Sequence, residues 1–257
     1  MFPTQVETSA NPTSASGAIA RKLLVTQKLP PRNLYTELGF LEQRGDSAYR
    51  FEYLASYVNG QHFRELPGLP LKRGGIDSSR LFPFFAERVI SAGRPDRSQS
   101  LMYLDLESSA RPYEILARSG GIRKNDTIEL LPLPSVDPQG NHSLTFFVHG
   151  VRHLEDRNSY AVLDSLTPGD RLEIEREPMN MESELALRVE SQDAKLGYVP
   201  HPLIEYIGSA VRKNKYSLTV VQRNSAEAGF HQRLLVEFRC PGSSSAGDFA
   251  GSRWETW

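Results

Sequence analysis

The second half of the chain constrains the fold most, because it consists of short runs in which apolar and polar residues alternate. In chain order these runs are LTFFVHG, RLEIER, LALRVE, LGYVP, YSLTVVQ and RLLVEFR. Alternation with a period of two is typical of strands that bury one face. Between the fourth and fifth runs, apolar residues at helical spacing indicate one helix: Leu203, Ile207, Ala210 and Val211. This pattern predicts a small closed β-barrel with a helix at one end.

The preceding part of the chain has a mixed pattern. Tyr49, Phe51 and Tyr53 alternate with polar residues, as in a half-buried strand. A helix is expected after Ser79, and a second is expected to begin at Pro112 and to end at Gly120. We therefore predict an α+β protein, with a mixed α/β domain followed by the barrel.

Turn residues set the expected domain limits. The segment SVDPQGNHS at 135–143 separates two apolar runs, so we place a boundary near residue 140, between domains at 21–140 and 141–240. The ends at 1–20 and 241–257 are rich in small and polar residues and are expected to be flexible. Within the second end, Trp254 and Trp257 are candidates for docking onto the folded part.

Composition excludes several classes of protein. Lys and Arg number 30 against 31 Asp and Glu, and the net charge of −1 excludes attraction to nucleic acid by bulk charge alone. The single cysteine, Cys240, excludes a disulfide framework and a cysteine-based zinc site. The N-terminus lacks the pattern of a signal peptide, and no later stretch resembles a membrane span. We expect a soluble cytoplasmic protein with no membrane partner.

Charge is distributed unevenly within the expected barrel. Residues 161–199 contain four basic and nine acidic residues, whereas residues 200–240 contain six basic and three acidic ones. Glu173, Glu175 and Glu177 alternate along one strand, so they are expected to line an exposed face that repels DNA. Arg212 and Lys213 lie at the end of the expected helix, where cations complement the helix dipole. A phosphate contact is the alternative interpretation for these two residues.

The order of motifs in the second half resembles the HIRAN domain, over about Ser143 to Cys240. The matching pieces are FFVHGVRHL, LDSLTPGDRLEIEREPMN and LALRVESQDAKLGYVP, followed by the helix. HIRAN domains are found fused to DNA translocases of chromatin remodelling and repair, and they also occur in bacterial proteins without an ATPase. The resemblance implies an OB-like barrel that captures the 3′ end of single-stranded DNA.

The same resemblance suggests which residues form the pocket. A phosphate-binding arginine and a neighbouring aromatic match Arg152 and His153, so the arginine is retained and a different ring follows it. A Tyr-Asp pair of the family matches Glu182 and Ser183, which removes a stacking ring worth on the order of 1 to 3 kcal/mol per base. Tyr198 occupies the third position, where it can stack or form a hydrogen bond. Asn180 matches an asparagine that we assign to the turn rather than to contact with DNA.

Residues 22–133 resemble, more loosely, the accessory N-terminal subdomain of HipA-type toxin kinases. The matching pieces are RFEYLASY, LPGLPL, SSRLFPFFAERVISAGRPDR and PYEILARSGG. The kinase core has no counterpart in the sequence. The combination implies membership of a family of bacterial proteins that join such a segment to a HIRAN domain.

Signatures of catalysis are absent from the sequence. There is no P-loop, no H-R-D or D-F-G motif and no G-x-S-x-G elbow, so we predict no enzyme activity, no catalytic residues and no cofactor. His149 and His153 are four residues apart on an expected strand and turn, which does not favour a metal site. Arg88, Arg94 and Arg97 are expected to pair with nearby carboxylates, and a partner contact is the alternative.

Two hypotheses follow from the sequence. In the first, the barrel binds single-stranded DNA or a DNA end through six residues: Arg152, His153, Arg176, Tyr198, Arg212 and Lys213. In the second, the barrel has lost DNA capture and the protein is an adaptor, of a toxin or defence type, that docks a protein partner through residues 21–140. Glu182, Ser183 and the acidic strand face favour the second hypothesis.

Overall fold

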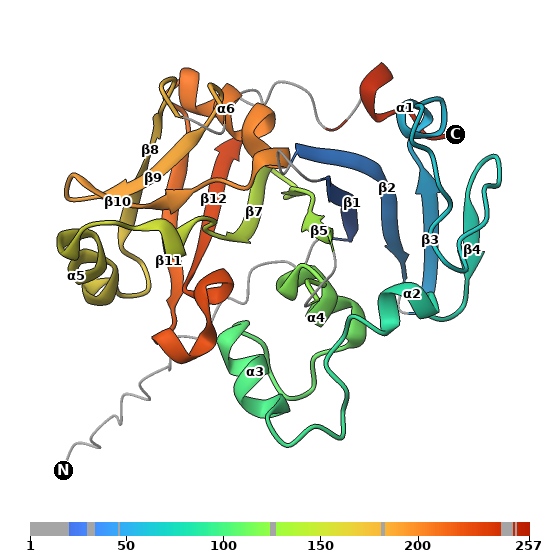
Figure 1. Cartoon of the computed structure of the whole chain (residues 1–257), viewed down its shortest axis with the longest axis horizontal. Helices are drawn as coiled ribbons and strands as arrows, with labels where there is room; N and C mark the ends of the chain where they lie inside the picture. Colours follow the sequence, from blue (N-terminus) through green and yellow to red (C-terminus); the bar gives the residue numbers. More distant parts are fainter. Residues whose placement is uncertain are drawn as a thin grey trace, which may run out of the picture.

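Two antiparallel sheets lie side by side in the computed structural model of the chain (Figure 1). The structure describes residues 21–29, 34–45, 47–123, 127–180, 183–242, 249 and 251–257. The N-terminal segment at 1–20, expected to be flexible, lies outside the described residues. We refer to described residues 21–132 as the first unit and to residues 135–242 as the second unit.

The first unit is built on a five-stranded sheet with the order β4-β3-β2-β1-β5. Its strands are β1 (Lys22–Leu29), β2 (Leu34–Arg44), β3 (Ala48–Tyr53), β4 (Ile76–Ser78) and β5 (Ile128–Pro132). Its helices are α1 (Ala55–Val58), α2 (Pro83–Ala86), α3 (Arg97–Tyr103) and α4 (Pro112–Ser119). The predicted strand at Tyr49 to Tyr53 is confirmed as β3, and its alternate aromatic residues are buried.

The two helices predicted in the first unit differ in outcome. Helix α4 begins at Pro112 and ends before Gly120, whose φ of +69° is the left-handed conformation that glycine favours, so both predicted ends are confirmed. Helix α2 begins only at Pro83 and covers four residues, so the longer helix predicted after Ser79 is wrong. Proline is favoured at the first position of a helix, which places the start at Pro83 and not at Ser79.

The second unit is built on a seven-stranded sheet with the order β10-β9-β8-β11-β12-β7-β6. Its strands are β6 (Ser135–Val136), β7 (Asn141–Phe147), β8 (Arg171–Arg176), β9 (Leu187–Ser191), β10 (Ala194–Tyr198), β11 (Ser217–Arg223) and β12 (Leu234–Pro241). Its helices are α5 (Arg157–Ser165) and α6 (Ile204–Arg212), with short 3₁₀ turns η1 (Val151–His153), η2 (His201–Leu203), η3 (Ala226–Ala228) and η4 (Phe230–Gln232). Helix α6 is the predicted helix, whereas α5 was not predicted.

The described strands of the second unit do not close into a barrel, contrary to the prediction. The chain leaving β7 meets β10 at a single isolated bridge, between His149 and Tyr198. The strand β7 ends at Phe147, and the chain then turns at Gly150 into η1, so no ladder forms between β7 and β10. The sheet therefore curls until its two sides touch at one point.

The expected boundary near residue 140 lies inside the second sheet. Asp137 accepts hydrogen bonds from the backbone N–H groups of Gln139 and Asn141, at 2.9 and 2.8 Å, and so stabilises the turn of a β6–β7 hairpin. The change from the first sheet to the second falls between Pro132 and Ser135.

Apolar and polar contacts join the two units. A small cluster of buried residues combines α3 and α4 with β7 and β12, and consists of Leu101, Leu104, Ile115, Phe147 and Leu235. Beside it, Gln222 and Asn224 donate from their side-chain amides to the backbone oxygens of Met102 and Tyr103, each at 2.7 Å. The orientation of the units is therefore defined by side chains from both.

Residues 251–257, assigned to the flexible end, instead pack against the first unit. The backbone N–H of Trp257 donates to Tyr53 (2.9 Å), and that of Ala55 donates to Glu255 (2.8 Å). The ring of Trp254 lies 6.1 Å from that of Phe40. Figure 1 shows the C-terminus beside α1 and β3. The docking foreseen for the two tryptophans occurs because β3 has backbone groups free to pair with this segment.

Candidate nucleic-acid interface

The candidate interface lies where β10 ends beside the chain that leaves β7. The backbone N–H of His149 donates to the oxygen of Tyr198 (2.9 Å), and the N–H of Tyr198 donates to the oxygen of His149 (2.8 Å). Gly197 permits this close approach, because its φ is +142° and a Cβ there would lie 2.3 Å from the His149 oxygen. The end of β10 is thus held against the segment that enters η1.

The η1 turn, which carries Arg152 and His153, packs against the end of β10 and begins beside the ring of Tyr198. Gly150 begins this turn with a φ of +76°, and a Cβ on it would lie 3.1 Å from Cδ2 of Tyr198. Arg152 and His153 are both exposed, and Nε of Arg152 donates to Nε2 of His153 at 2.9 Å. The structure therefore places the turn that carries Arg152 and His153 against the strand that ends at Tyr198, so three of the six residues proposed from sequence lie on adjoining segments.

Polar side chains surround the hydroxyl of Tyr198. This hydroxyl donates to Oε2 of Glu177 (2.6 Å) and accepts from Nδ2 of Asn180 (2.9 Å), which also donates to Glu177 (2.8 Å). The backbone N–H of Ser183 donates to Oδ1 of Asn180 at 3.2 Å. Asn180 thus stabilises the turn, as expected, and also orients the tyrosine.

The same contacts shift the ionisation of both partners. Burial, and then the hydrogen bond to Glu177, raise the pKa of Tyr198. For Glu177, burial acts to raise the pKa, but the hydrogen bonds from Tyr198 and Asn180, together with nearby cations, lower it overall. At neutral pH a carboxylate therefore lies beside a protonated phenol, and the phenol is a hydrogen-bond donor.

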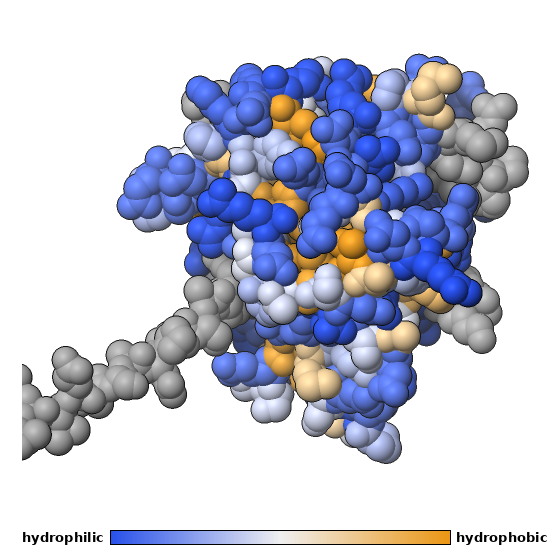
Figure 2. Space-filling view, turned by 90° about the vertical axis from the view of Figure 1, so that its left-hand side faces the viewer, coloured by the Kyte–Doolittle hydropathy of each residue, from blue (hydrophilic) through white to orange (hydrophobic). Residues whose placement is uncertain are grey.

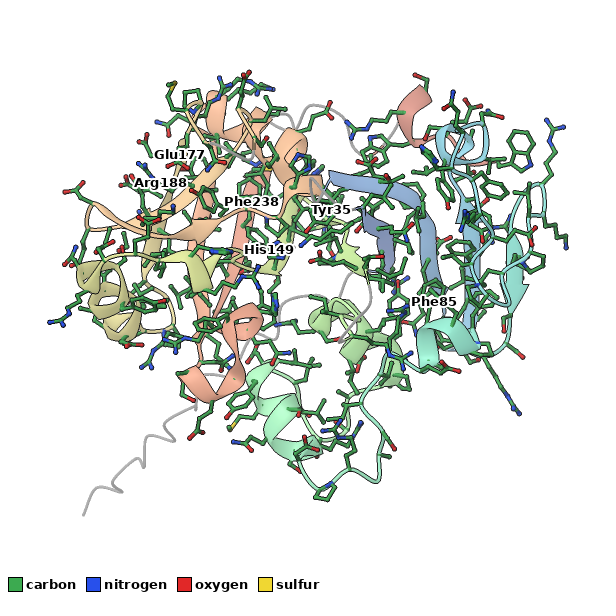
Figure 3. The ribbon with its side chains drawn as sticks, viewed as in Figure 1. Tyr35, Phe85, His149, Glu177, Arg188 and Phe238 are labelled. Carbon is green, nitrogen blue, oxygen red and sulfur yellow. The ribbon has the colours of Figure 1, made fainter. Side chains whose placement is uncertain are left out.

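Two cations on the β9–β10 hairpin border Tyr198. Arg188 lies directly across the hairpin from Tyr198 and forms ion pairs with Glu190 (2.7 Å) and Glu177 (3.6 Å). Nζ of Lys195 lies 4.7 Å from the centroid of the Tyr198 ring. Figure 3 shows Glu177 and Arg188 close together at the outer side of the second sheet. We call Glu177, Asn180, Arg188, Lys195 and Tyr198 the Tyr198 cluster.

Arg176 does not join the Tyr198 cluster. In the β8–β9 ladder Arg176 is paired with Leu187, which is buried, whereas Glu175 is paired with Arg188. Paired residues lie on the same face of a sheet, and neighbours along a strand lie on opposite faces. Arg176 is therefore on the face opposite Tyr198, so the structure does not bring these two predicted residues together. Arg188 was missed because the sequence does not show this register.

Arg212 and Lys213 also lie apart from Tyr198. They are exposed at the C-terminal end of α6. A guanidinium nitrogen of Arg212 and Cδ1 of Leu187 lie 3.6 and 3.7 Å from the position of a Cβ on Gly208. Arg212 thus folds back along its own helix on the Leu187 side of the sheet. This arrangement agrees with the interpretation of a solvated helix end.

The β8–β9 connection contains the two positions that departed from the HIRAN pattern. Glu182 lies outside the described residues, so its predicted place in the pocket is not addressed. Ser183 is partly buried, and its hydroxyl accepts from the backbone N–H of Leu185 at 3.2 Å, within the turn that Asn180 stabilises. Met179 and Leu185, in the same connection, are 91% and 59% exposed.

An aromatic residue from a distant part of the chain lies beside η1. Turn η4, in the β11–β12 connection, packs against η1 and carries Phe230, whose side chain is 51% exposed. In the same turn, burial lowers the pKa of His231, and the nearby His149, Lys28 and Arg152 lower it further. Phe230 thus offers an exposed ring on a turn that packs against the turn carrying Arg152. The sequence reasoning missed it, and its only signal is one aromatic in a polar loop.

The face around this site is mainly hydrophilic. Glu173 and Glu175 on β8 are exposed, as predicted from their alternation. Figure 2 shows the side of the molecule that carries α5 and β8 to β10, where apolar residues gather near the centre and hydrophilic residues surround them. The acidic strand face therefore borders the site and disfavours an extended phosphate track.

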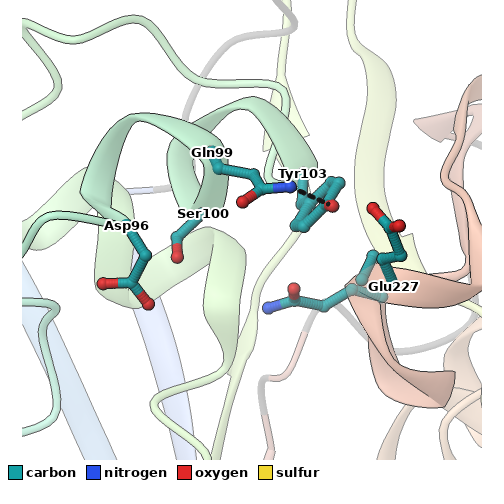
Figure 4. Close-up of a pocket in the computed structure, with 7 residues that line it drawn as sticks. Asp96, Gln99, Ser100, Tyr103 and Glu227 are labelled. Carbon is teal, nitrogen blue, oxygen red and sulfur yellow. Dashed lines mark hydrogen bonds between the residues drawn. The ribbon is translucent and has the colours of Figure 1, made fainter.

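A separate cavity of about 420 Å³ lies between α3 and the β11–β12 connection (Figure 4). Its lining residues are Asp96, Gln99, Ser100, Tyr103, Glu227, Ala228 and Gln232. With two carboxylates and no cation in this lining, it is unsuited to a phosphate. Nearby, Asp96 pairs with Arg94, and Arg97 donates to the backbone oxygen of Ile90 (2.7 Å). The predicted carboxylate pair is therefore confirmed for Arg94, whereas Arg97, like Arg88 with Gly121, donates to a backbone oxygen.

Two further properties concern only the described part of the chain. No group of three or more His, Cys, Asp or Glu side chains there is arranged to hold a metal ion. None of the helices there has the length and apolar character needed to cross a membrane.

Comparison with known proteins identifies the second unit. The family profile named HIRAN domain matches residues 141–244. A crystal structure of a protein from Lactobacillus plantarum is 21% identical, with a TM-score of 0.32, and the match covers 39% of this chain and 97% of that chain. The HIRAN domain of human HLTF is 16% identical, with a TM-score of 0.30 and coverages of 42% and 86%. A search of curated proteins found no match.

Proposed function

Because residues 141–244 form a HIRAN domain, we propose that this protein binds nucleic acid, and that its second unit engages single-stranded DNA or a DNA 3′ end without catalysing a reaction. The observation that carries the proposal is that the turn with Arg152 and His153 packs against the end of β10 at Tyr198. The resemblance of residues 22–133 to HipA-type kinases and a bacterial origin remain predictions.

The chemistry of the site suits a short stretch of single strand. The exposed guanidinium of Arg152 is placed to contact a backbone phosphate. The exposed rings of His153 and Phe230 supply surfaces for bases, and stacking contributes about 1 to 3 kcal/mol per base. These groups span only a few nucleotides, so we propose local binding and not a long track.

The Tyr198 cluster suits the end of a strand better than its middle. The carboxylate of Glu177 remains ionised and can accept a hydrogen bond from a terminal hydroxyl. It would repel a phosphate in the same place. This asymmetry supports recognition of a free 3′ hydroxyl over an internal phosphodiester.

The test is fluorescence anisotropy at low ionic strength with a labelled single strand that ends in a 3′ hydroxyl. The comparison ligands are the same strand with a 3′ phosphate and a blunt duplex. We expect Arg152→Ala to weaken binding about tenfold and to reduce the slope of log K against log salt by about 0.7, the value for one phosphate contact. Arg171→Ala, an exposed arginine at the opposite end of β8, is the matched control. Equal binding by the two variants would contradict the proposal.

A second candidate is a protein-binding adaptor of the toxin or defence type. The exposed apolar side chains of Met179 and Leu185, beside the acidic residues of β8, favour it. Recovery of a stoichiometric protein partner, together with no salt-sensitive DNA binding, would support this function over the first. Loss of that partner on Met179→Ser with Leu185→Ser would place the contact on the β8–β9 connection, whereas a contact through residues 21–140, as predicted from the sequence, should survive both changes.

A further inference from the structure

Two histidines of the second unit reach into the first unit from either side of Tyr198. His149, the backbone partner of Tyr198, places Nε2 at 3.1 Å from Oε1 of Glu129 on β5. His201, three residues after Tyr198, stacks on Tyr35 of β2, with ring centroids 5.7 Å apart and an angle of 6° between the planes. Figure 3 shows Tyr35 and His149 near the middle of the molecule, where the two sheets meet.

Tyr35 and Glu129, the residues of the first unit that these histidines contact, are hydrogen-bonded to each other. The hydroxyl of Tyr35 donates to Oε2 of Glu129 at 2.9 Å. Nζ of Lys28 lies 3.9 Å from the same oxygen and 4.8 Å from the centroid of the Tyr35 ring. Both segments that flank Tyr198 are therefore anchored to one hydrogen-bonded pair in the first sheet.

The anchor is buried and hydrogen-bonded. The side chain of Glu129 is only 7% exposed, and its strand is fixed by the Thr26 hydroxyl, which donates to the backbone oxygen of Glu129 at 2.9 Å. Burial acts to raise the pKa of Glu129, but His149, Lys28 and Tyr35 outweigh it and lower the pKa to about 2. Removing a partner from a buried carboxylate strongly destabilises the folded protein. The folded state therefore favours the arrangement in which Glu129 keeps His149, Lys28 and Tyr35 as partners.

We propose that Glu129 and Tyr35 are positioning residues of the nucleic-acid pocket, so that the first unit takes part in binding by holding the two segments that flank Tyr198. His149 precedes Arg152 by three residues, so the Glu129 contact sets the path of the chain into η1. His201 begins the η2 turn that follows β10, so the Tyr35 contact fixes the other side of Tyr198. This inference rests on the proposed function, but the effect of Glu129 and Tyr35 on the two segments that flank Tyr198 can be tested by hydrogen exchange without a ligand.

The experiment compares Glu129→Gln and Tyr35→Phe in the full chain by hydrogen exchange and by DNA binding. We expect Glu129→Gln to accelerate exchange in residues 148–154 and 197–203 together. We also expect it to weaken binding of the 3′-ended single strand about fivefold, within the range of energetic coupling through positioning residues. Tyr35→Phe keeps the stacked ring and loses only the hydroxyl, so a smaller change in the same two segments is expected.

The matched control is Asp105→Asn, which removes the ion-pair partner (3.4 Å) of the buried Arg118 within the first unit. A merely structural role for Glu129 predicts that both variants lose stability and show the same exchange pattern. Paired acceleration of the two flanking segments, in Glu129→Gln and not in Asp105→Asn, supports positioning. If Glu129→Gln does not fold, Tyr35→Phe decides the question by the same pattern.

The two proposals fail in distinguishable ways. If the wild-type protein binds none of the DNA ligands, the proposed function fails, whereas paired acceleration would still support positioning of the turn. If the wild-type protein binds DNA and Glu129→Gln binds equally well with unchanged exchange, the positioning role is overturned and the proposed function stands.

Discussion

Three buried tyrosines of the first unit and Tyr198 of the second unit are held by different kinds of partner. In the first unit the hydroxyls of Tyr53, Tyr57 and Tyr113 donate to backbone oxygens of Leu69, Arg64 and Arg21, at 2.8, 3.0 and 2.8 Å. In the second unit the hydroxyl of Tyr198 donates to a side-chain carboxylate, and that carboxylate also accepts from Asn180.

The difference separates a structural use of tyrosine from one suited to binding. Burial raises the pKa of Tyr53 to about 12, and its hydroxyl connects β3 to the chain between Leu66 and Leu69. Such a bond joins two stretches of backbone and cannot be exchanged without opening the fold. The bonds of Tyr198 join surface side chains, which can exchange them for contacts with a ligand. Changes in the aromatic core of the first unit should therefore alter stability, and changes at the site should alter binding.

The largest effect is expected from Phe51→Ala in the first unit. Phe51 is fully buried, and its ring lies 4.7 Å from that of Tyr53 and 5.7 Å from that of Phe85. Truncation leaves a cavity and should lower the free energy of unfolding by about 3 to 5 kcal/mol, measured by chemical denaturation. DNA affinity per folded molecule should stay unchanged. A loss of DNA affinity in a fully folded sample would contradict the distinction between core residues that affect stability and site residues that affect binding.

The next largest effect is a pH dependence of the free energy of unfolding, which arises from Glu129 at the contact between the two units. The pKa of Glu129 is lowered from 4.5 to about 2, so its ionisation contributes stability above pH 4.5, and that contribution is lost as the pH falls towards 2. The shift corresponds to a loss of about 2 to 3 kcal/mol over this window. Denaturation curves at pH 7, 4.5 and 3 should show this loss for the wild-type protein and a smaller one for Glu129→Gln. Parallel pH profiles for the two proteins would exclude the contribution.

A smaller effect, confined to binding, is expected from Phe230→Ala. The ring is half exposed beside η1, so its removal should change the free energy of unfolding by no more than about 0.5 kcal/mol. If it stacks on a base, the binding free energy should fall by about 1 to 3 kcal/mol, measured by anisotropy. Phe230→Tyr keeps the ring and should retain most of the affinity. Loss of affinity in both variants would point away from stacking.

The smallest effect is expected from Tyr198→Phe. The substitution removes the hydroxyl but leaves Glu177 bonded to Asn180, so a loss of about 1 kcal/mol in the free energy of unfolding is expected. The ring is retained, so discrimination between 3′-hydroxyl and 3′-phosphate strands should change more than overall affinity. Unchanged discrimination would indicate that the hydroxyl and Glu177 do not face the strand end.

Features set by neighbouring residues could be predicted well. Strands β7 to β12 and helices α4 and α6 follow from alternation, from helical spacing, and from Pro112 and Gly120 at the helix ends, all of which depend on local geometry. The two-residue strand β6 was missed because it lies in the segment assigned to the domain boundary. Helix α5 was missed because its apolar face is short, with only Val162 and Leu163 as buried apolar residues. The long helix after Ser79 was wrong because the position of Pro83 outweighed the apolar spacing.

By itself, the sequence determined the HIRAN motifs of residues 141–244 and the presence of Arg152, His153 and Tyr198 within them. Only the tertiary structure decided which residues accompany them. Arg188 depends on the register of the β9–β10 hairpin, and Phe230 on the packing of η4 against η1. Glu129 depends on how two sheets meet. Alternation along a strand shows which face a residue occupies, but the curl of the sheet and the packing of the units decide which distant segment that face meets.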